Sequence, residues 1–306
     1  MVHVIGEILV DIFKSESSEE VFPGGAPFNV ASNIKHFGGD VSFYGAVGKD
    51  EYGKFLSKFA RSRKFNNLLI KKCNTRYTTQ AIVSLNNGER SFKFVRENGA
   101  DYALSIKNLE KLDIKENDIV HIGSLMLSFP RGRKFFTKAV EFAKSKGALI
   151  SFDVNYRDDI FISALSAKNI CKKAMKVADI IKISDEELNI LDKAKKIETQ
   201  IKNLGLENKI VFISKGKDGS TMKNSKNQFI SVCTKPIKPV DTTGAGDAFY
   251  SYILYELDKD ISKINNIELV MKMLQKANAV GAIATQKKGA INVVPSIEEL
   301  DKYLGD

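Results

Sequence analysis

The chain has 306 residues, of which 43% are hydrophobic and 27% are charged, a balance typical of a globular protein with a substantial buried core. Its formal net charge is +10, but the lysines are scattered among acids on helical faces, so we expect a solvated surface and no nucleic-acid partner. The three cysteines are far apart, and the first residues resemble a strand and not a signal peptide, so we expect a cytoplasmic protein. No apolar run reaches membrane-spanning length, so we expect no membrane partner.

Short apolar runs rich in Val and Ile alternate with segments of helical period along the chain. The predicted strands are residues 2–8, 41–47, 118–124, 148–154, 179–184 and 209–214. The predicted helices are residues 27–37, 51–63, 132–147, 167–178, 185–196, 246–257 and 267–286. This alternation, with nearly continuous apolar strands, predicts an α/β fold in which helices cover both faces of a mostly parallel sheet.

Two segments break the alternation. Residues 10–21 continue the first strand into a polar stretch, and residues 79–97 alternate apolar and polar side chains around "NNGE", which is typical of a β-hairpin. We expect a small β-sheet beside the main one, and such a sheet is a candidate lid over the crevice at the strand ends. The alternative is an edge hairpin that has no moving role.

The stretch "VDTTGAGDAF" (240–249) joins a glycine turn to the start of an apolar helix. Gly244 and Gly246 permit close backbone approach, and the unpaired N–H groups at a helix start favour a bound anion. Asp247 lies in the first turn, where the helix dipole should lower its pKa. Asp247 either caps the helix or accepts a proton from an attacking hydroxyl while the turn holds a phosphate. A second acid, Asp241, on the other side of the turn favours the phosphate hypothesis.

Two motifs carry a family resemblance. "DTTGAGDAF" resembles the C-terminal signature of the PfkB-type carbohydrate kinases (the ribokinase family), and "PGGAPFNVASNIKHFGG" is similar to their N-terminal signature as fructokinases have it. The segments "GAVGKDEYGKFL", "FDVNYR", "IIKISDEEL" and "SKGKDGS" match in order between them, so the resemblance covers essentially the whole chain. It implies a single domain over residues 1–306, with a ribokinase-like three-layer fold, a mostly parallel central sheet and a small β-sheet lid.

The resemblance also implies ATP-dependent phosphorylation of a sugar hydroxyl, with MgATP as co-substrate. The catalytic base falls on Asp247, and the anion hole falls on the backbone of Gly244, Ala245 and Gly246. The implied sugar-binding residues are Asp11, Gly24, Gly25, Asn29, Arg96 and Arg157. For the two arginines, a surface ion pair is the alternative, and for Asn29 it is an ordinary residue at a helix start.

The implied ATP-binding residues lie in the second half of the chain: Asn155, Lys182, Ser184, Glu187, Lys215, Gly216, Gly219 and Asn278. Glu187 would position Mg²⁺ through water. Many members of the family also need a monovalent cation, and the resemblance places K⁺ among Asp241, Thr243, Ala284 and Gly289. In the family the lid often serves as a dimer interface, so a homodimer through the lid is a further expectation.

Two positions depart from the family pattern. Phe28 stands where a small residue is usual and is expected to narrow or reshape the sugar pocket. Val154 replaces the usual Pro and is expected to loosen its turn. We expect a fructokinase that makes fructose 6-phosphate. The alternatives are a kinase for 2-keto-3-deoxygluconate or a related keto acid, which Arg96 and Arg157 would suit, and a non-catalytic sugar or nucleotide sensor.

Overall fold

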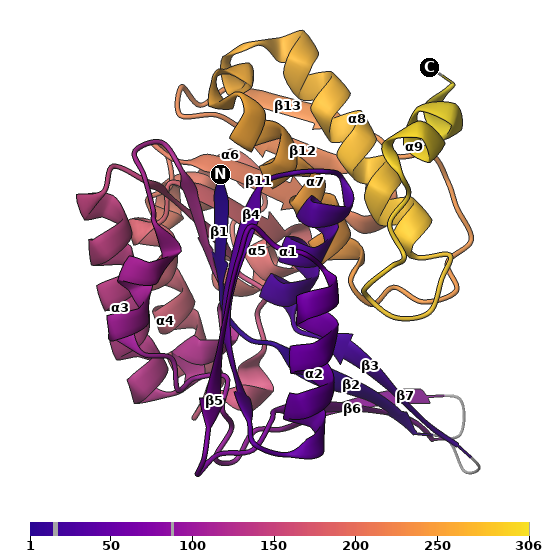
Figure 1. The fold of residues 1–306 in the computed structure, drawn as a ribbon. Helices are drawn as coiled ribbons and strands as arrows, with labels where there is room; N and C mark the ends of the chain where they lie inside the picture. The colour runs from indigo at the N-terminus through magenta and orange to yellow at the C-terminus, as the bar shows by residue number, and fades with distance from the viewer. Residues whose placement is uncertain (15–17, 87–88, 306) are drawn as a thin grey trace.

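Two β-sheets organise the molecule (Figure 1). Within residues 1–14, 18–86 and 89–305, which the computed structural model describes, they are a nine-stranded sheet in the order β13-β12-β11-β10-β9-β8-β1-β4-β5 and a four-stranded sheet in the order β3-β2-β6-β7. The large sheet contains β1 (Val2–Ile5), β4 (Val41–Gly48), β5 (Asn67–Cys73), β8 (Ile119–Ile122), β9 (Leu149–Asp153), β10 (Ile180–Ser184), β11 (Ile210–Ser214), β12 (Ser220–Lys223) and β13 (Phe229–Val232). The seven strands β11, β10, β9, β8, β1, β4 and β5 are parallel to one another, as predicted. Among the described strands of this sheet, only β12 and β13 run antiparallel to their neighbours, β12 to β11 and β13 to β12.

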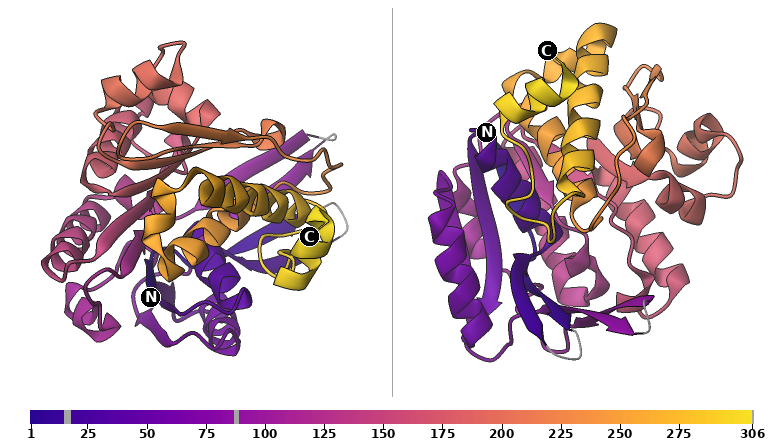
Figure 2. Two further views of the ribbon diagram at one scale, coloured as in Figure 1. Left: turned by 90° about the horizontal axis from the view of Figure 1, so that it is seen from above. Right: turned by 90° about the vertical axis from the view of Figure 1, so that its right-hand side faces the viewer.

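Helices cover both faces of the large sheet (Figures 1 and 2). One face carries α1 (Ala26–His36), α2 (Glu51–Ser62), α7 (Ala245–Lys259), α8 (Ile267–Ala284) and α9 (Ile297–Leu304). The other carries α3 (Pro130–Ser145), α4 (Ala164–Val177), α5 (Asp185–Leu191) and α6 (Ile197–Leu204). The result is three layers, with the sheet in the middle.

The alternating side chains of the strands explain the two-sided core. In β11, Ile210 and Phe212 join the cluster under α1, α7 and α8, whereas Val211 and Ile213 join the cluster under α3 to α6. Both faces are therefore apolar, which is why the sequence of the strand is continuously hydrophobic.

One helix is shorter than predicted. The pattern predicts a helix over residues 185–196, but α5 ends at Leu191. Asp192 adopts an extended conformation, and its side chain accepts a hydrogen bond from the Ala194 N–H at 2.9 Å. A local turn of this kind competes with the helical hydrogen bonds, so the chain leaves the helix there.

The small sheet consists of β2 (Leu9–Lys14), β3 (Glu19–Gly24), β6 (Gln80–Asn86) and β7 (Glu89–Val95). β2 pairs antiparallel with β3 and parallel with β6, and β6 and β7 form the predicted hairpin. The hairpin turn at Asn87 and Gly88 and part of the predicted 10–21 extension, residues 15–17, lie outside the described residues. Figure 1 shows this sheet projecting beside the large one.

Phe28 is a core residue and not part of a pocket wall. Its side chain is fully buried, and its ring packs at centroid distances of 5.0 to 6.1 Å against Phe43, Phe59 and Phe65. The prediction that Phe28 narrows the sugar pocket is therefore wrong, because the helical position turns its ring toward the large sheet.

Truncating this ring should destabilise the fold. We expect Phe28→Ala to lower the free energy of unfolding by about 3–5 kcal/mol, because it leaves a cavity among three other rings. Urea unfolding measures the loss, and Phe55→Ala on α2 is the matched control, since Phe55 is 39% exposed. Equal losses in the two variants would contradict the assignment of Phe28 to the core.

Candidate active site

The candidate active site is a cavity of about 880 Å³ at the carboxyl ends of the parallel strands. Its wall includes the ends of β10 and β11, the first turn of α1 and the first turn of α7. Thirteen of the predicted residues line it: Asp11, Gly25, Asn29, Asn155, Arg157, Lys182, Ser184, Glu187, Gly216, Thr243, Gly244, Gly246 and Asp247. Residues from both ends of the chain therefore meet in one cavity.

The glycine turn before α7 presents backbone donors to this cavity. Gly244 caps the helix in the left-handed conformation (φ 75°), and a Cβ there would lie 2.5 Å from the Ala290 Cβ, so only glycine fits. The Ala245 N–H donates to the Thr242 carbonyl. The N–H groups of Gly246 and Asp247 belong to the first helical turn, which has no intrahelical acceptors for them. These donors and the positive end of the helix dipole favour an anion.

Asp247 lies beside these donors and accepts a hydrogen bond from the Asn29 side-chain amide at 2.7 Å. Desolvation by the surrounding protein raises the pKa of Asp247, although Asn29, Lys182 and Arg157 each act to lower it. The prediction that the pKa of Asp247 is lowered is therefore wrong, because desolvation by burial is the largest influence on it. A carboxylate with a raised pKa is a better proton acceptor for a hydroxyl than an ordinary surface Asp.

Asp11 and the glycine pair form the neighbouring part of the wall. Asp11 is 7% exposed, and burial followed by the charges of Asp247 and Asp241 raises its pKa to about 7. A Cβ at Gly24 would lie 2.1 Å from Asp11 Oδ2, so glycine makes room for this carboxyl. Gly25 has φ 106° and caps α1, so the chain turns sharply into the helix that carries Asn29.

A buried ion pair forms another part of the site. Lys182 Nζ lies 3.1 Å from Asp153 Oδ2, and both residues are buried. Burial raises the pKa of Asp153 to about 7. The pKa of Lys182 is raised because, although burial lowers it, the carboxyl groups of Asp153, Glu187 and Asp247 outweigh burial. A Cβ at Gly246 would lie 3.2 Å from Lys182 Nζ, so the cation stands next to the backbone donors of α7.

A capping box holds Ser184 and Glu187. Ser184 caps α5, and Glu187 Oε2 accepts the Ser184 N–H at 2.7 Å while Oε1 accepts the Tyr156 N–H at 2.7 Å.

The adjacent turn contains Asn155, which has φ 35°. Val154 donates its N–H to the Lys182 carbonyl at 3.0 Å, a hydrogen bond that proline lacks. Val154 therefore ties this turn to β10, contrary to the expected loosening.

The loop of Asp241 packs against residues 285–290. Asp241 is 2% exposed; its Oδ1 accepts the N–H and the hydroxyl of Thr243, and its Oδ2 accepts the Gly289 N–H at 3.0 Å. The Val240 and Asp241 N–H groups both donate to the Thr285 carbonyl, just beyond the end of α8 at Ala284. The four residues predicted to surround a monovalent cation therefore belong to one packed region.

Comparison with known proteins places this site in a family. The pfkB family carbohydrate kinase profile matches residues 2–297, almost the whole chain. The chain belongs to the pfkB family of carbohydrate kinases. The predicted architecture of the family, a mostly parallel central sheet with a small separate sheet, is confirmed.

Three relatives illustrate the similarity of this pfkB-family kinase to known proteins. The probable fructokinase-2 of Arabidopsis thaliana is 36% identical over 98% of this chain and 94% of the relative. A double-mutant fructokinase of Vibrio cholerae O395 in a fructose-, ADP- and potassium-bound form has a TM-score of 0.87 and 29% identity, covering 99% of this chain and 97% of the other. The ATP-bound fructokinase of Xylella fastidiosa has a TM-score of 0.90 and 26% identity, covering 100% and 99%.

Several predicted residues of this pfkB-family chain lie outside the cavity wall. They are Gly24, Arg96, Lys215, Gly219, Asp241, Ala245, Asn278, Ala284 and Gly289. Arg96 is 5% exposed, forms an ion pair with Asp101, and donates to Ser128 Oγ at 2.9 Å and to the Leu125 carbonyl at 3.1 Å. Asn278 donates to the Val232 carbonyl at 3.1 Å and so ties α8 to β13. Their roles in sugar and adenine binding stay predictions.

Two acids of the site are missing from the sequence analysis. Glu7 follows β1 and lines the cavity, and Asp153 ends β9 and pairs with Lys182. A usable signal is present for both, since an acid directly after an apolar parallel strand lies at the edge of the sheet where ligands bind.

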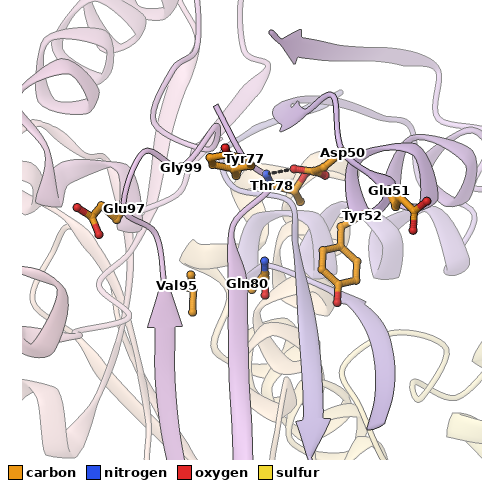
Figure 3. Close-up of a pocket in the computed structure, with 9 residues that line it drawn as sticks. All are labelled: Asp50, Glu51, Tyr52, Tyr77, Thr78, Gln80, Val95, Glu97 and Gly99. Carbon is orange, nitrogen blue, oxygen red and sulfur yellow. Dashed lines mark hydrogen bonds between the residues drawn. The ribbon is translucent and has the colours of Figure 1, made fainter. Parts of the chain in front are cut away.

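A second pocket, of about 430 Å³, lies where the chain enters and leaves the small sheet (Figure 3). Asp50 caps α2 and also accepts the Thr78 N–H and hydroxyl, both at 2.6 Å, so it fixes the root of β6 to the helix. Tyr52, Tyr77 and Glu97 are among the other residues that line it. None of the predicted site residues lines this pocket.

Among the helices that the structure describes, none combines the length and apolar character that crossing a bilayer requires.

Proposed function

We propose that this pfkB-family chain is a fructokinase that converts fructose and MgATP to fructose 6-phosphate and ADP. One observation carries the proposal: Asp247 is hydrogen-bonded to Asn29 at the N-terminus of α7, in the same cavity as Asp11 and Gly25. A carboxyl group that can accept a proton, a helix end that can bind an anion and a polar site for the acceptor sugar thus adjoin one another. The full-length similarity to proteins named fructokinase supports fructose as the acceptor.

The reaction follows from these roles. Asp247 accepts the proton of the attacking sugar hydroxyl, whose oxygen forms a bond to the γ-phosphorus as the bond to the ADP oxygen breaks. The N–H groups at the start of α7 and the Lys182 ammonium stabilise the negative charge of the transferring phosphoryl group. Asp11 and Asn29 orient the sugar, and the nucleotide binds along Asn155, Ser184, Lys215, Gly216, Gly219 and Asn278.

Mg²⁺ would neutralise part of the ATP charge, and Glu187 would hold it through water. The residue fits this role, because each Glu187 oxygen accepts one backbone N–H and a carboxylate keeps further lone pairs for water. Asp241 and the carbonyl oxygens of Thr243, Ala284 and Gly289 would form the K⁺ site. The potassium in the Vibrio cholerae relative supports this assignment.

The charges at the acceptor end favour a neutral sugar over a keto acid. Glu7, Asp11 and Asp247 all line it, whereas the guanidinium of Arg96 is paired with Asp101. A substrate carboxylate would meet these acids and would be repelled to the extent that they are ionised. Arg157 lines the same cavity, so 2-keto-3-deoxygluconate is the second candidate.

The proposal extends to the whole chain. Residues 1–306 would be one kinase domain, in which the small sheet acts as a lid that excludes water during transfer and serves as a homodimer interface. We also propose a cytoplasmic location, because none of Cys73, Cys171 and Cys233 forms a disulfide, as a reducing compartment requires.

The test is ADP release from MgATP with fructose, tagatose, ribose, 2-keto-3-deoxygluconate and a nucleoside, in potassium and in sodium buffer. We expect fructose to give the highest kcat/KM and potassium to exceed sodium. A higher kcat/KM for the keto acid would identify the keto acid as the substrate in place of fructose and would leave the proposed mechanism unchanged. Binding of ATP without turnover of any sugar would overturn the proposed function.

A further inference from the structure

Glu7 is a buried acid that the mechanism above does not use. It is 1% exposed, yet it is part of the wall of the main cavity, which Asp11 and Asn29 also line. Neither of its carboxyl oxygens has a hydrogen-bonding partner on another residue of the described chain. A Cβ at Gly123 would lie 2.7 Å from Glu7 Oε2, so glycine at that position leaves room for the carboxyl group.

An unpartnered buried carboxyl is costly to the folded protein. Leaving a buried polar group without a hydrogen bond destabilises a protein by roughly 1–3 kcal/mol, so native proteins rarely keep one unless a ligand or water completes it. Asn29 Oδ1, from another residue that lines this cavity, is also buried without a partner in the described chain. Two polar groups that lack partners in one cavity indicate a polar ligand there.

Among the residues that the structure describes, no charged group forms an ion pair with Glu7. Arg96, Asp101 and Asp247 influence it electrostatically, but Arg96 is already paired with Asp101. Leu9 and Leu125 form apolar wall on the same side of the cavity. Burial, reinforced by Asp101 and Asp247 and opposed by its own backbone N–H and Arg96, raises the pKa of Glu7 to about 8. At neutral pH the group is therefore mostly protonated.

We propose that Glu7 binds the acceptor sugar as a neutral carboxylic acid, donating one hydrogen bond and accepting another. A protonated carboxyl offers one O–H donor and retains acceptor capacity, which complements a sugar hydroxyl, itself both donor and acceptor. The donated and the accepted hydrogen bond then satisfy both Glu7 oxygens without placing a further negative charge beside the phosphates. This inference rests on the proposed function and adds a sugar-binding residue to it.

Two nearly isosteric variants separate hydrogen bonding from packing. Glu7→Gln keeps a donor and an acceptor, and Glu7→Leu keeps only the volume. We expect Glu7→Leu to raise KM for fructose at least about tenfold and Glu7→Gln to change it by less than about threefold at pH 7. KM for MgATP should stay within about twofold in both, because Glu7 adjoins the acceptor and not the nucleotide. Glu141→Gln on α3, an exposed acid paired with Lys138, is the matched control.

The pH dependence tests the neutral form directly. Deprotonation removes the donor and adds a charge, so wild-type KM for fructose should rise about tenfold from pH 7 to pH 9, as a group with a pKa near 8 requires. Glu7→Gln should lose this rise. The neighbouring Asp11, with a pKa of about 7, also titrates near this range, and the Glu7→Gln profile isolates its contribution.

The outcomes distinguish this inference from the proposed function. Equal KM values for wild type, Glu7→Gln and Glu7→Leu, with an active wild type, would overturn the Glu7 assignment alone. A rise of KM with pH that persists unchanged in Glu7→Gln would do the same for the neutral acid. A wild type that phosphorylates no sugar would overturn the proposed function and this inference with it. If another sugar than fructose is turned over, the same comparison is made with that sugar.

Discussion

Replacing Asp247 by Asn should lower kcat for sugar phosphorylation by about three orders of magnitude, within the range of about 10²–10⁴ typical of a positioned general base. The amide cannot accept the hydroxyl proton, but it has the size of the carboxyl group and can still hydrogen-bond to Asn29. KM for MgATP and for the sugar should therefore change by no more than a few-fold. Steady-state ADP release measures both parameters.

Asp113→Asn is the control for this change. Its side chain is 79% exposed, and its backbone is in the left-handed conformation, which Asn adopts readily. It should keep the wild-type kcat. Asp247→Asn with more than about a tenth of wild-type kcat would show that Asp247 is not the general base, since that loss is below the range expected for one.

Lys182→Met should reduce kcat by about 10²-fold or more, because it removes a buried cation from the side of the cavity where we propose that the phosphoryl group transfers. It should also destabilise the fold by about 3–5 kcal/mol at high pH, because Asp153 is left as an unpaired buried acid. Without the lysine, the pKa of Asp153 rises further above its unfolded value. Relative to wild type, the stability loss should therefore be small at pH 6, where Asp153 is protonated in both proteins. It should grow as the pH rises above about 7, the pKa of Asp153 in the folded wild type, and level off above the higher pKa of the folded variant.

The double variant Lys182→Met/Asp153→Asn separates the two effects of this lysine. Asn removes the unpaired acid, so the double variant should recover most of the stability at pH 8 in a thermal unfolding measurement. It should not recover kcat. Recovery of both would mean that Lys182 only supports the fold and has no part in phosphoryl transfer.

The large sheet is predictable from sequence because its strands bury both faces. Ile210 to Ile213 alternate between two apolar clusters, and this two-sided burial produces a hydrophobic run that periodicity detects. The end of α5 is not predictable in this way. The turn that Asp192 forms with Ala194 outweighs a helical pattern that continues to residue 196.

Some features of the candidate site are likewise predictable from sequence, and others are not. Asp247 and its glycine turn could be found because backbone chemistry requires those residue types next to one another. The pKa of Asp247 could not, because it depends on burial by segments distant in the chain. Likewise, Phe28 shows no sign in sequence that its ring meets Phe43 and Phe65, and Arg96 shows no sign that Asp101 engages it.

The contact between Asn29 and Asp247 joins residues 218 positions apart. A ribosome makes the segment with Asp11 and Asn29 first and Asp247 more than two hundred residues later. A nascent chain that has not yet released α7 therefore holds Asp11 and Asn29 but has neither Asp247 nor the N-terminus of α7. Domains generally fold as units during synthesis. Under the proposed mechanism, the incomplete polypeptide lacks the general base, and phosphoryl transfer requires the last third of the chain to pack against the first.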